Sequence, residues 1–388
     1  MFACRLAATS ITLAILTRFF GIGACMSSPR FYALDALRGL AIALMILVNT
    51  PGSWQHVYSP LLHAPWDGFT FADIVFPTFL FVVGAAMFYS LKTTELSPQS
   101  VWRISSRALK LIGIGVLLNY VPFSVDLAEL RLPGVLQRIG LAYWCAALLV
   151  LSVKRSYLPF IAVVLVLLYW LALILGGGEQ PYSLQHNLVR QWDLAIFGAA
   201  HLYQGFGVAF DPEGLLSTLP CIVAVLIGFA TASTLQGKQH NQALRLLLLS
   251  GLALVVLAAL WQLLWPVNKA LWSGSYLALS SGLILLLLAI LVWCIDIKGW
   301  TALAEPLKVY GTNPLFIYIL SWLWAVLIGQ LIFIPTDAGS VSLYQWGFEQ
   351  LALIFPAKLA SFVFAVLHVI GFWYLSLLLY KRNIVIKL

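Results

Sequence analysis

Histidine, aspartate and proline occur together in one short stretch of the sequence, His63-Ala-Pro-Trp-Asp-Gly-Phe-Thr-Phe-Ala-Asp73-Ile-Val-Phe-Pro77. A histidine beside a carboxylate can serve as a general base that the acid orients. Pro77 has no N–H, so the carbonyl of Asp73 loses the partner that a regular helix would supply. We therefore predict that His63 and Asp73 act together in a functional site. A capping aspartate in an interfacial loop is the alternative.

A second polar set falls on one face of a predicted helix. Asp35 and Arg38 are three residues apart, and Asn49 follows Arg38 by eleven residues, which is three helical turns. The helix would therefore carry polar groups at both of its ends. For Asp35, a local ion pair that anchors the helix end is the alternative.

Basic residues form a third set, in which Arg103, Arg107 and Lys110 follow the spacing i, i+4 and i+7. This spacing places them on one helix face, where they can bind phosphate groups. A basic helix end at the cytoplasmic side of a membrane explains the same charges equally well.

Polar and aromatic side chains also gather in segment 176–214, the longest predicted loop, which contains Asp193, His201, Tyr203, Asp211 and Glu213. A loop of this composition suits a sugar or another small polar acceptor, and a solvated loop is the alternative. Lys269 is the only cation in its own predicted loop.

The elements that carry these residues are membrane-spanning helices. The chain has 388 residues, of which 62% are hydrophobic and 9% are charged, and its mean hydropathy is +0.96. Soluble domains contain about 25% charged residues, so a soluble enzyme is excluded. Long unbroken apolar runs exclude an outer-membrane barrel, whose strands alternate. The sequence therefore predicts an all-α, polytopic membrane bundle. The net charge of +8 indicates loops beside anionic lipid and not a nucleic-acid partner.

Ten apolar segments have about the length that a bilayer requires. We expect transmembrane helices at 36–55, 71–91, 104–121, 135–153, 157–175, 215–235, 243–265, 271–294, 309–331 and 357–380. Residues 27–388 would then form a single transmembrane domain. Residues 1–26 are an apolar segment interrupted by Arg18, for which an over-long start with Met26 as initiator and an eleventh span are both open.

Charge asymmetry predicts the orientation of the core. If the sides alternate from the first span, one side carries fifteen Lys and Arg residues and the other carries five. The richer side is expected to be cytoplasmic, so both ends of the ten-span core lie there. A cleaved signal at Ile22-Gly-Ala-Cys25 would put Ser27 outside, which contradicts this count.

Stretches that include Leu34–Gly39, Asn49 and His63–Pro77 resemble the heparan-α-glucosaminide N-acetyltransferase family of transmembrane acyltransferases, and within it the bacterial NagX-type members associated with N-acetylglucosamine utilisation. The matching stretches run in order across nearly the whole core: Leu34–Gly39, Asn49, His63–Pro77, Arg131–Arg138, His201–Gln204, Asp211–Gly214, Pro266–Tyr276 and Gly311–Asn313. The sequence lacks the large extra N-terminal domain of the lysosomal members, which makes heparan sulfate itself a less expected acceptor.

The resemblance implies that acetyl-CoA supplies an acetyl group from the cytoplasmic side and that an amino sugar accepts it on the outer side. His63 matches the catalytic histidine of the family, and Asn49 matches its active-site asparagine. Such a transfer needs a proton acceptor and an oxyanion stabiliser. We assign these roles to His63 and Asn49, with Asp73 or Asp67 orienting the histidine or binding acceptor hydroxyls. Direct transfer and an acetyl-histidine intermediate are both open.

The remaining expectations concern ligands and partners. The predicted acceptor-binding residues are Trp66, Asp67, His201, Asp211 and Lys269, and those for acetyl-CoA are Arg38, Arg103, Arg107 and Lys110. No metal is expected. The chain would lie in a bacterial inner membrane, with lipid and a second copy of itself as candidate partners. An amino-sugar transporter and a non-catalytic scaffold are the alternatives to an enzyme.

Overall fold

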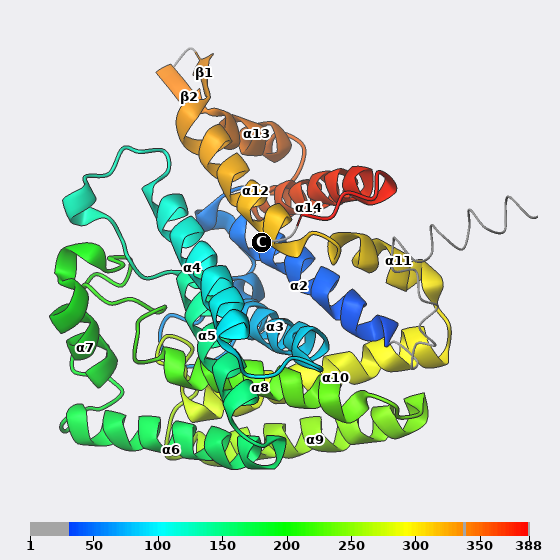
Figure 1. The fold of residues 1–388 in the computed structure, drawn as a ribbon. Helices are drawn as coiled ribbons and strands as arrows, with labels where there is room; N and C mark the ends of the chain where they lie inside the picture. Colours follow the sequence, from blue (N-terminus) through cyan, green and yellow to red (C-terminus); the bar gives the residue numbers. More distant parts are fainter. Residues whose placement is uncertain (1–30, 337–338, 387–388) are drawn as a thin grey trace, which may run out of the picture. The chain divides into compact units, whose positions relative to one another are not determined.

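The computed structural model describes residues 31–336 and 339–386, and the predicted segment 1–26 lies outside them. Within this part of the chain the structure is almost entirely helical (Figure 1). The longer elements are α2 (Tyr32–Asn49), α3 (Val75–Leu91), α4 (Pro98–Tyr120), α5 (Val135–Ser152), α6 (Leu158–Gly176), α7 (Leu188–Phe197), α8 (Thr218–Leu235), α9 (His240–Trp261), α10 (Gly274–Leu291), α11 (Thr301–Tyr310), α12 (Pro314–Val326), α13 (Leu343–Ala352) and α14 (Ala357–Lys381).

Short elements connect and extend these helices. Two π-helical turns prolong α10 and α12, namely η7 (Val292–Ile297) and η8 (Leu327–Leu331). The strands β1 (Phe333–Thr336) and β2 (Gly339–Ser342) form an antiparallel hairpin before α13. Single 3₁₀ turns occur at η1 (Trp54–His56), η2 (Ser59–Leu61), η3 (Phe71–Ile74), η4 (Leu127–Glu129), η5 (Arg155–Tyr157) and η6 (Ala199–His201).

In the part of the chain that the structure describes, nine helices are long and apolar enough to cross a membrane. They are Tyr32–Asn49, Phe71–Leu91, Val135–Ser152, Arg155–Gly176, Thr218–Leu235, His240–Trp261, Gly274–Ile297, Pro314–Leu331 and Ala357–Lys381. Each overlaps a predicted span. The one remaining predicted span, 104–121, forms α4. This helix is more polar than the nine because Arg103, Arg107 and Lys110 lie on it. The chain is therefore an all-α polytopic membrane protein, and the total of ten spans stays a prediction.

Glycines allow the central helices to pack with their backbones close together. A Cβ atom on Gly84 of α3 would lie 1.9 Å from the Val225 carbonyl oxygen of α8, and one on Gly39 of α2 would lie 1.7 Å from the Leu307 carbonyl oxygen of α11. Apolar burial does not drive helices together within lipid, so such close packing is a main source of association. It holds α2 and α3, the two helices that flank the His63 loop, in the centre of the bundle.

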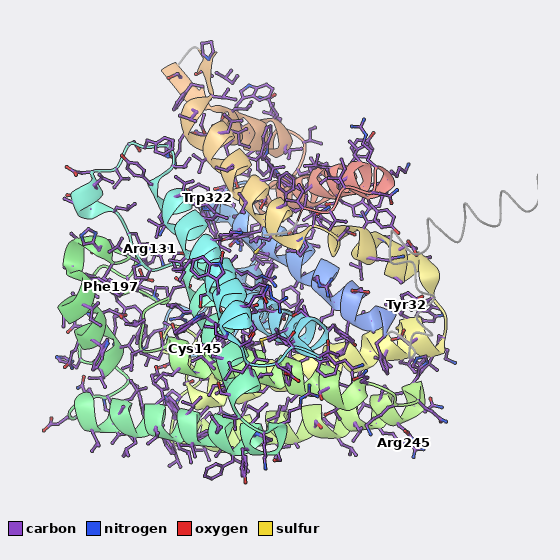
Figure 2. The ribbon with its side chains drawn as sticks, in the orientation of Figure 1. Tyr32, Arg131, Cys145, Phe197, Arg245 and Trp322 are labelled. Carbon is purple, nitrogen blue, oxygen red and sulfur yellow. The ribbon has the colours of Figure 1, made fainter. Side chains whose placement is uncertain are left out.

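The connections gather at two opposite ends of the bundle, as alternating spans require. At one end the Trp66 indole donates a hydrogen bond to the Tyr182 carbonyl at 2.9 Å. At the other end the backbone N–H of Tyr32 donates to the carboxylate of Asp296 at 3.1 Å. Figure 2 shows this separation, with Phe197 at one end and Tyr32 at the other. Segments predicted on one side of the membrane therefore contact one another.

Segment 176–214 is more ordered than a simple loop, because it contains α7 and η6. The predicted span 309–331 begins later, at Pro314, because Tyr310 ends the separate helix α11. Proline is favoured in the first turn of a helix, where its missing N–H has no partner to lose. These differences leave the order of the spans unchanged.

Candidate active site

His63 and Asp73 contact each other directly. The imidazole Nδ1 lies 2.8 Å from Oδ1 of Asp73. The Asp73 side chain is fully buried, whereas that of His63 is about half exposed. A buried carboxylate that accepts from Nδ1–H fixes the tautomer and leaves Nε2 with the lone pair. The pair thus has the geometry of a general base and its orienting acid.

The chain around Asp73 holds its carboxylate in one orientation. Thr70 and Asp73 form a capping box at the start of η3. Oδ2 of Asp73 accepts hydrogen bonds from Ala64 N–H at 3.2 Å, from Thr70 N–H at 2.9 Å and from the Thr70 hydroxyl at 2.9 Å. Because these three donors engage Oδ2, Oδ1 is left to face His63.

A tyrosine far away in the sequence supplies the hydrogen-bond donor that Pro77 lacks. The carbonyl of Asp73, which has no N–H partner four residues later, accepts a hydrogen bond from the Tyr276 hydroxyl at 2.7 Å. Tyr276 is fully buried on α10. The opened turn is therefore satisfied within the protein, and it ties the His63 loop to α10.

Lys269 completes the group around His63. Its ammonium lies 2.9 Å from Nδ1 and 3.2 Å from Nε2 of the imidazole, and 3.4 Å from Oδ1 of Asp73. Burial lowers the pKa of Lys269, while the charge of Asp73 opposes that shift. Asn268 donates to the Asp67 carboxylate at 3.1 Å. Asp67 thus helps to position the loop that carries Lys269.

A pocket of about 110 Å³, which we call the central pocket, brings these side chains together with others. Its polar lining consists of Asn49, His63, Glu213, Lys269 and Tyr318. Its apolar lining consists of Met45, Val48, Ala72, Val75, Phe76, Phe79, Val135, Leu136 and Ile139. An apolar pocket with a few convergent polar groups is the common form of a small-molecule site.

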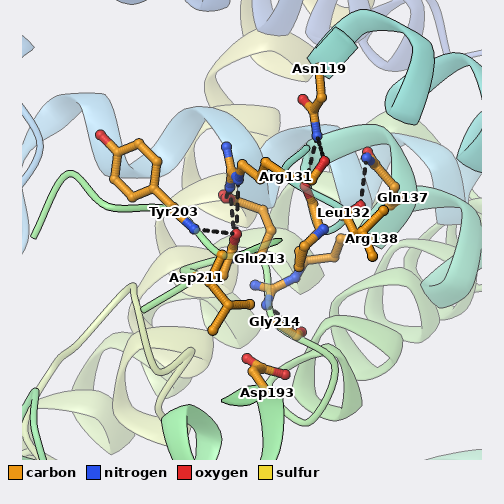
Figure 3. A network of polar contacts seen from close by, with 12 residues as sticks. Asn119, Arg131, Leu132, Gln137, Arg138, Asp193, Tyr203, Asp211, Glu213 and Gly214 are labelled. Carbon is orange, nitrogen blue, oxygen red and sulfur yellow. Dashed lines mark hydrogen bonds and ion pairs between the residues drawn. The ribbon is translucent and has the colours of Figure 1, made fainter. Parts of the chain in front are cut away.

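Glu213 belongs to a partly buried ion-pair network that adjoins the central pocket (Figure 3). The Arg131 guanidinium donates to both carboxylate oxygens of Asp211, at 2.8 and 2.7 Å, and to Glu213 at 2.6 Å. Asp211 also accepts from the Tyr203 N–H at 3.1 Å. These acids hold the pKa of Arg131 above its ordinary value, although burial works against them. The network fixes Glu213 at the pocket wall.

Arg138 and Asp193 lie near this network (Figure 3), and Asp193 accepts a hydrogen bond from the Leu215 N–H at 2.9 Å. The fully buried Arg138 donates to the Gly214 carbonyl at 2.9 Å and to the Ser217 hydroxyl, and it lies over the Trp272 ring. Nε and Nη1 of Arg138 have no hydrogen-bond partner among the described residues. Burial raises the pKa of Asp193 to about 6.

Only one of the five predicted acceptor-binding residues lines the central pocket. Lys269 lines the central pocket, whereas the other four are engaged elsewhere. Trp66 packs edge-on against Phe210. Asp67 and Asp211 are in the contacts described above, and His201 contacts the Leu130 carbonyl at 2.7 Å through Nδ1.

Three of the four predicted acetyl-CoA residues share a second site at the other end of α3. Arg103, Arg107 and Lys110 line a pocket of about 980 Å³, which we call the basic pocket. Arg107 lies 5.1 Å from the Tyr143 ring centroid. Arg38 does not line this pocket; it pairs with Asp35 at 3.3 Å. No group of three or more His, Cys, Asp or Glu side chains that could hold a metal ion occurs in residues 31–336 and 339–386.

Glu213 and Tyr318 also line the central pocket; the sequence named Glu213 only as one member of the polar loop and did not indicate Tyr318 at all. Glu213 follows Asp211 by two residues in the polar loop, so the charge of that loop was the available signal. Tyr318 is one of 15 tyrosines, and nothing in its local sequence marks it. Its place depends on how α12 packs beside α2.

Comparison with known proteins identifies the family. A model described as heparan-alpha-glucosaminide N-acetyltransferase, catalytic, matches residues 30–261. The chain is 28% identical to the heparan-alpha-glucosaminide N-acetyltransferase of Homo sapiens over 352 residues, which cover 75% of this chain and 52% of that protein. The corresponding protein of Mus musculus is 29% identical over 359 residues, covering 76% and 53%. The chain thus spans about half the length of these curated relatives. Because the family model matches more than half of the chain, including Asn49, His63 and Asp73, the chain belongs to the heparan-alpha-glucosaminide N-acetyltransferase family.

Proposed function

We propose that this protein is a membrane N-acetyltransferase that moves an acetyl group from cytoplasmic acetyl-CoA to the amine of a glucosamine-type sugar at the outer side. The observation that carries the proposal is the His63–Asp73 pair, whose histidine lines a pocket, in a chain that belongs to this family. The proposed location is a bacterial inner membrane, with both ends of the transmembrane core in the cytoplasm.

The proposed reaction uses His63 as the proton acceptor. With Nδ1–H donating to Asp73, Nε2 can take a proton from the attacking amine. The amine nitrogen bonds to the thioester carbonyl carbon, the carbon–sulfur bond breaks, and CoA leaves as the thiolate, which takes up the proton. In the alternative route, Nε2 itself forms an acetyl-imidazole before the amine attacks.

Asn49 and Lys269 can stabilise the oxyanion that forms on the thioester. Both line the same pocket as His63. Asn49 is exposed and lines the pocket, so the N–H groups of its carboxamide can reach a substrate there.

The basic pocket is the proposed site for the phosphates of acetyl-CoA. Its three cations suit charge-assisted contacts to phosphate. Phe79 lines the central pocket and Ser90 lines the basic pocket, eleven residues apart along α3. At 1.5 Å per residue this is roughly 16 Å, which an extended pantetheine arm can bridge. Arg107→Ala is expected to weaken acetyl-CoA binding by about tenfold or more. Unchanged affinity in the single alanine variants of all three cations would place the phosphates elsewhere.

The proposed function is tested with purified protein, labelled acetyl-CoA and glucosamine. Wild type should yield N-acetylglucosamine and free CoA. His63→Ala should still bind acetyl-CoA but lose about 10²–10⁴ in rate, and Asn49→Ala should lose about 10²–10³. His186→Ala, at an exposed loop position, is the matched control. Turnover of His63→Ala above about a tenth of wild type would exclude His63 as the base. Sugar uptake without any transfer would favour a transporter.

Topology is tested by cysteine labelling in intact cells. Ser53→Cys should react with an impermeant reagent and Lys92→Cys should not, because fifteen of the assigned basic residues lie on the side of Lys92. The reverse labelling pattern would overturn the proposed orientation.

A further inference from the structure

A larger pocket, open to the surface, adjoins the central pocket on the side of α12 and α13. It measures about 980 Å³, and we call it the aromatic chamber. It shares Asn49, Val135 and Tyr318 with the central pocket. A ligand whose reactive end lies beside His63 can therefore extend into the chamber. The volume lies near the upper end for small-molecule sites, and one sugar ring would leave much of it empty.

The walls of the chamber come from segments far apart in the sequence. Aromatic rings are provided by Trp54, Trp322, Tyr344 and Phe348. The Tyr344 hydroxyl donates to the Pro51 carbonyl at 2.6 Å, which joins α13 to the segment that follows α2. The chamber is thus held to the same segment that carries Asn49.

The polar side chains that line the chamber are mostly neutral, with one carboxylate. They include the carboxylate of Glu349 and the side chains of Gln55, Gln330 and Gln345. Gln345 donates to Glu349 at 2.8 Å, which orients the carboxylate. No lysine or arginine occurs among the described residues that line the chamber. The His56 imidazole is the basic side chain among the described lining residues. Phosphates, sulfates and carboxylates on a ligand would therefore meet no lysine or arginine here, whereas hydroxyl and ammonium groups would find acceptors.

We propose that the aromatic chamber binds the second sugar of an acceptor oligosaccharide and selects for uncharged or amine-bearing sugars over acidic ones. This inference rests on the proposed acetyl transfer. The amine of the terminal sugar would lie at the central pocket beside His63, and the next ring would pack on the aromatic side chains of the chamber. Glu349 is a specificity-determining residue in this arrangement, and it repels a uronate or sulfate group.

The test compares three acceptors with wild-type protein: glucosamine, a disaccharide of two glucosamine units, and glucosamine linked to glucuronic acid. Because Glu349 is exposed, the glucosamine disaccharide should have a kcat/KM about threefold to fivefold above that of the uronate disaccharide. In Glu349→Lys the KM for the glucosamine disaccharide should rise about tenfold, and the KM for the uronate disaccharide should fall. Free glucosamine should be unaffected within about twofold, because it does not reach Glu349.

Gln350→Lys provides the matched control. It introduces the same charge on the same helix, at an exposed position outside the chamber lining, so all three KM values should stay near those of wild type. Equal KM values for the two disaccharides in an active protein would refute the chamber assignment but not the proposed function. The same response in both lysine variants would do so as well. Absence of transfer to every acceptor would instead refute the proposed function.

Discussion

The substitution Asp73→Asn changes one atom in the site, and the structure predicts which way the new amide will face. Three donors, namely the Ala64 N–H and the N–H and hydroxyl of Thr70, surround Oδ2. The amide oxygen must take that position, because an NH₂ group there would face only donors. The NH₂ group is then directed at His63.

The expected consequence is a change of tautomer at His63. An amide that donates to Nδ1 places the imidazole proton on Nε2, where the base needs its lone pair. The variant should therefore lose about 10³–10⁴ in kcat, which corresponds to roughly 4–5.5 kcal/mol of transition-state stabilisation. Acetyl-CoA binding and the folded state should be retained, since the three hydrogen bonds to the oxygen are kept.

Single-turnover transfer from labelled acetyl-CoA to glucosamine measures this effect. The matched control is Asp126→Asn, which alters another capping aspartate, one that accepts from the Ala128 N–H at 3.0 Å in an exposed turn. The control should stay within about twofold of wild type, because it lies outside the central pocket. If Asp73→Asn retained more than a tenth of wild-type turnover, the tautomer argument would be refuted, and Asp73 would have only a structural role.

Three further predictions concern stability, measured as thermal unfolding in detergent. Tyr276→Phe should lower the free energy of unfolding by about 1–3 kcal/mol, because it leaves the buried carbonyl of Asp73 without a donor; no loss would mean that water replaces the hydroxyl. Asp193 is fully buried, and burial raises its pKa from 3.8 to about 6. Between about pH 4 and 6 the native state therefore holds a proton that the unfolded state has released, so the free energy of unfolding should fall as the pH rises through this range. Asp193→Asn should abolish this fall and stabilise the protein by up to about 3 kcal/mol above pH 6; an unchanged pH profile would contradict the assignment. Gly39→Ala should lower the free energy of unfolding by about 1–3 kcal/mol or more, because its Cβ atom would overlap a backbone carbonyl of α11. A Cβ atom at Gly113 would meet no atom within 4 Å, so Gly113→Ala should be neutral or stabilising. Equal effects of the two substitutions would refute the close-packing argument.

The fold class and the positions of most spans could be predicted from the sequence because the physical constraint is local. A long apolar segment in lipid must satisfy its own backbone hydrogen bonds, and a helix does this within the segment. The predicted span 71–91 thus agrees with the observed Phe71–Leu91. The contact between His63 and Asp73 was also predictable, because only ten residues separate them and Pro77 marks the opened turn.

The rest of the site depended on tertiary structure. Lys269 lies 206 residues from His63 in the chain, and Tyr276 lies 203 residues from Asp73. No local pattern indicates which loop contacts which. Asp211 illustrates the same limit, because a loop aspartate has the same sequence signal whether it binds a sugar or, as here, an arginine.

The sequence by itself determined that this is a helical membrane protein with a His–Asp pair, because hydropathy and short-range spacing act within one segment. Only the tertiary structure decided that Asn49, Glu213, Lys269 and Tyr318 share a pocket with His63. The physical reason is that helix packing, with its close glycine contacts and buried ion pairs, selects which polar groups are satisfied within the protein and which are left facing a cavity.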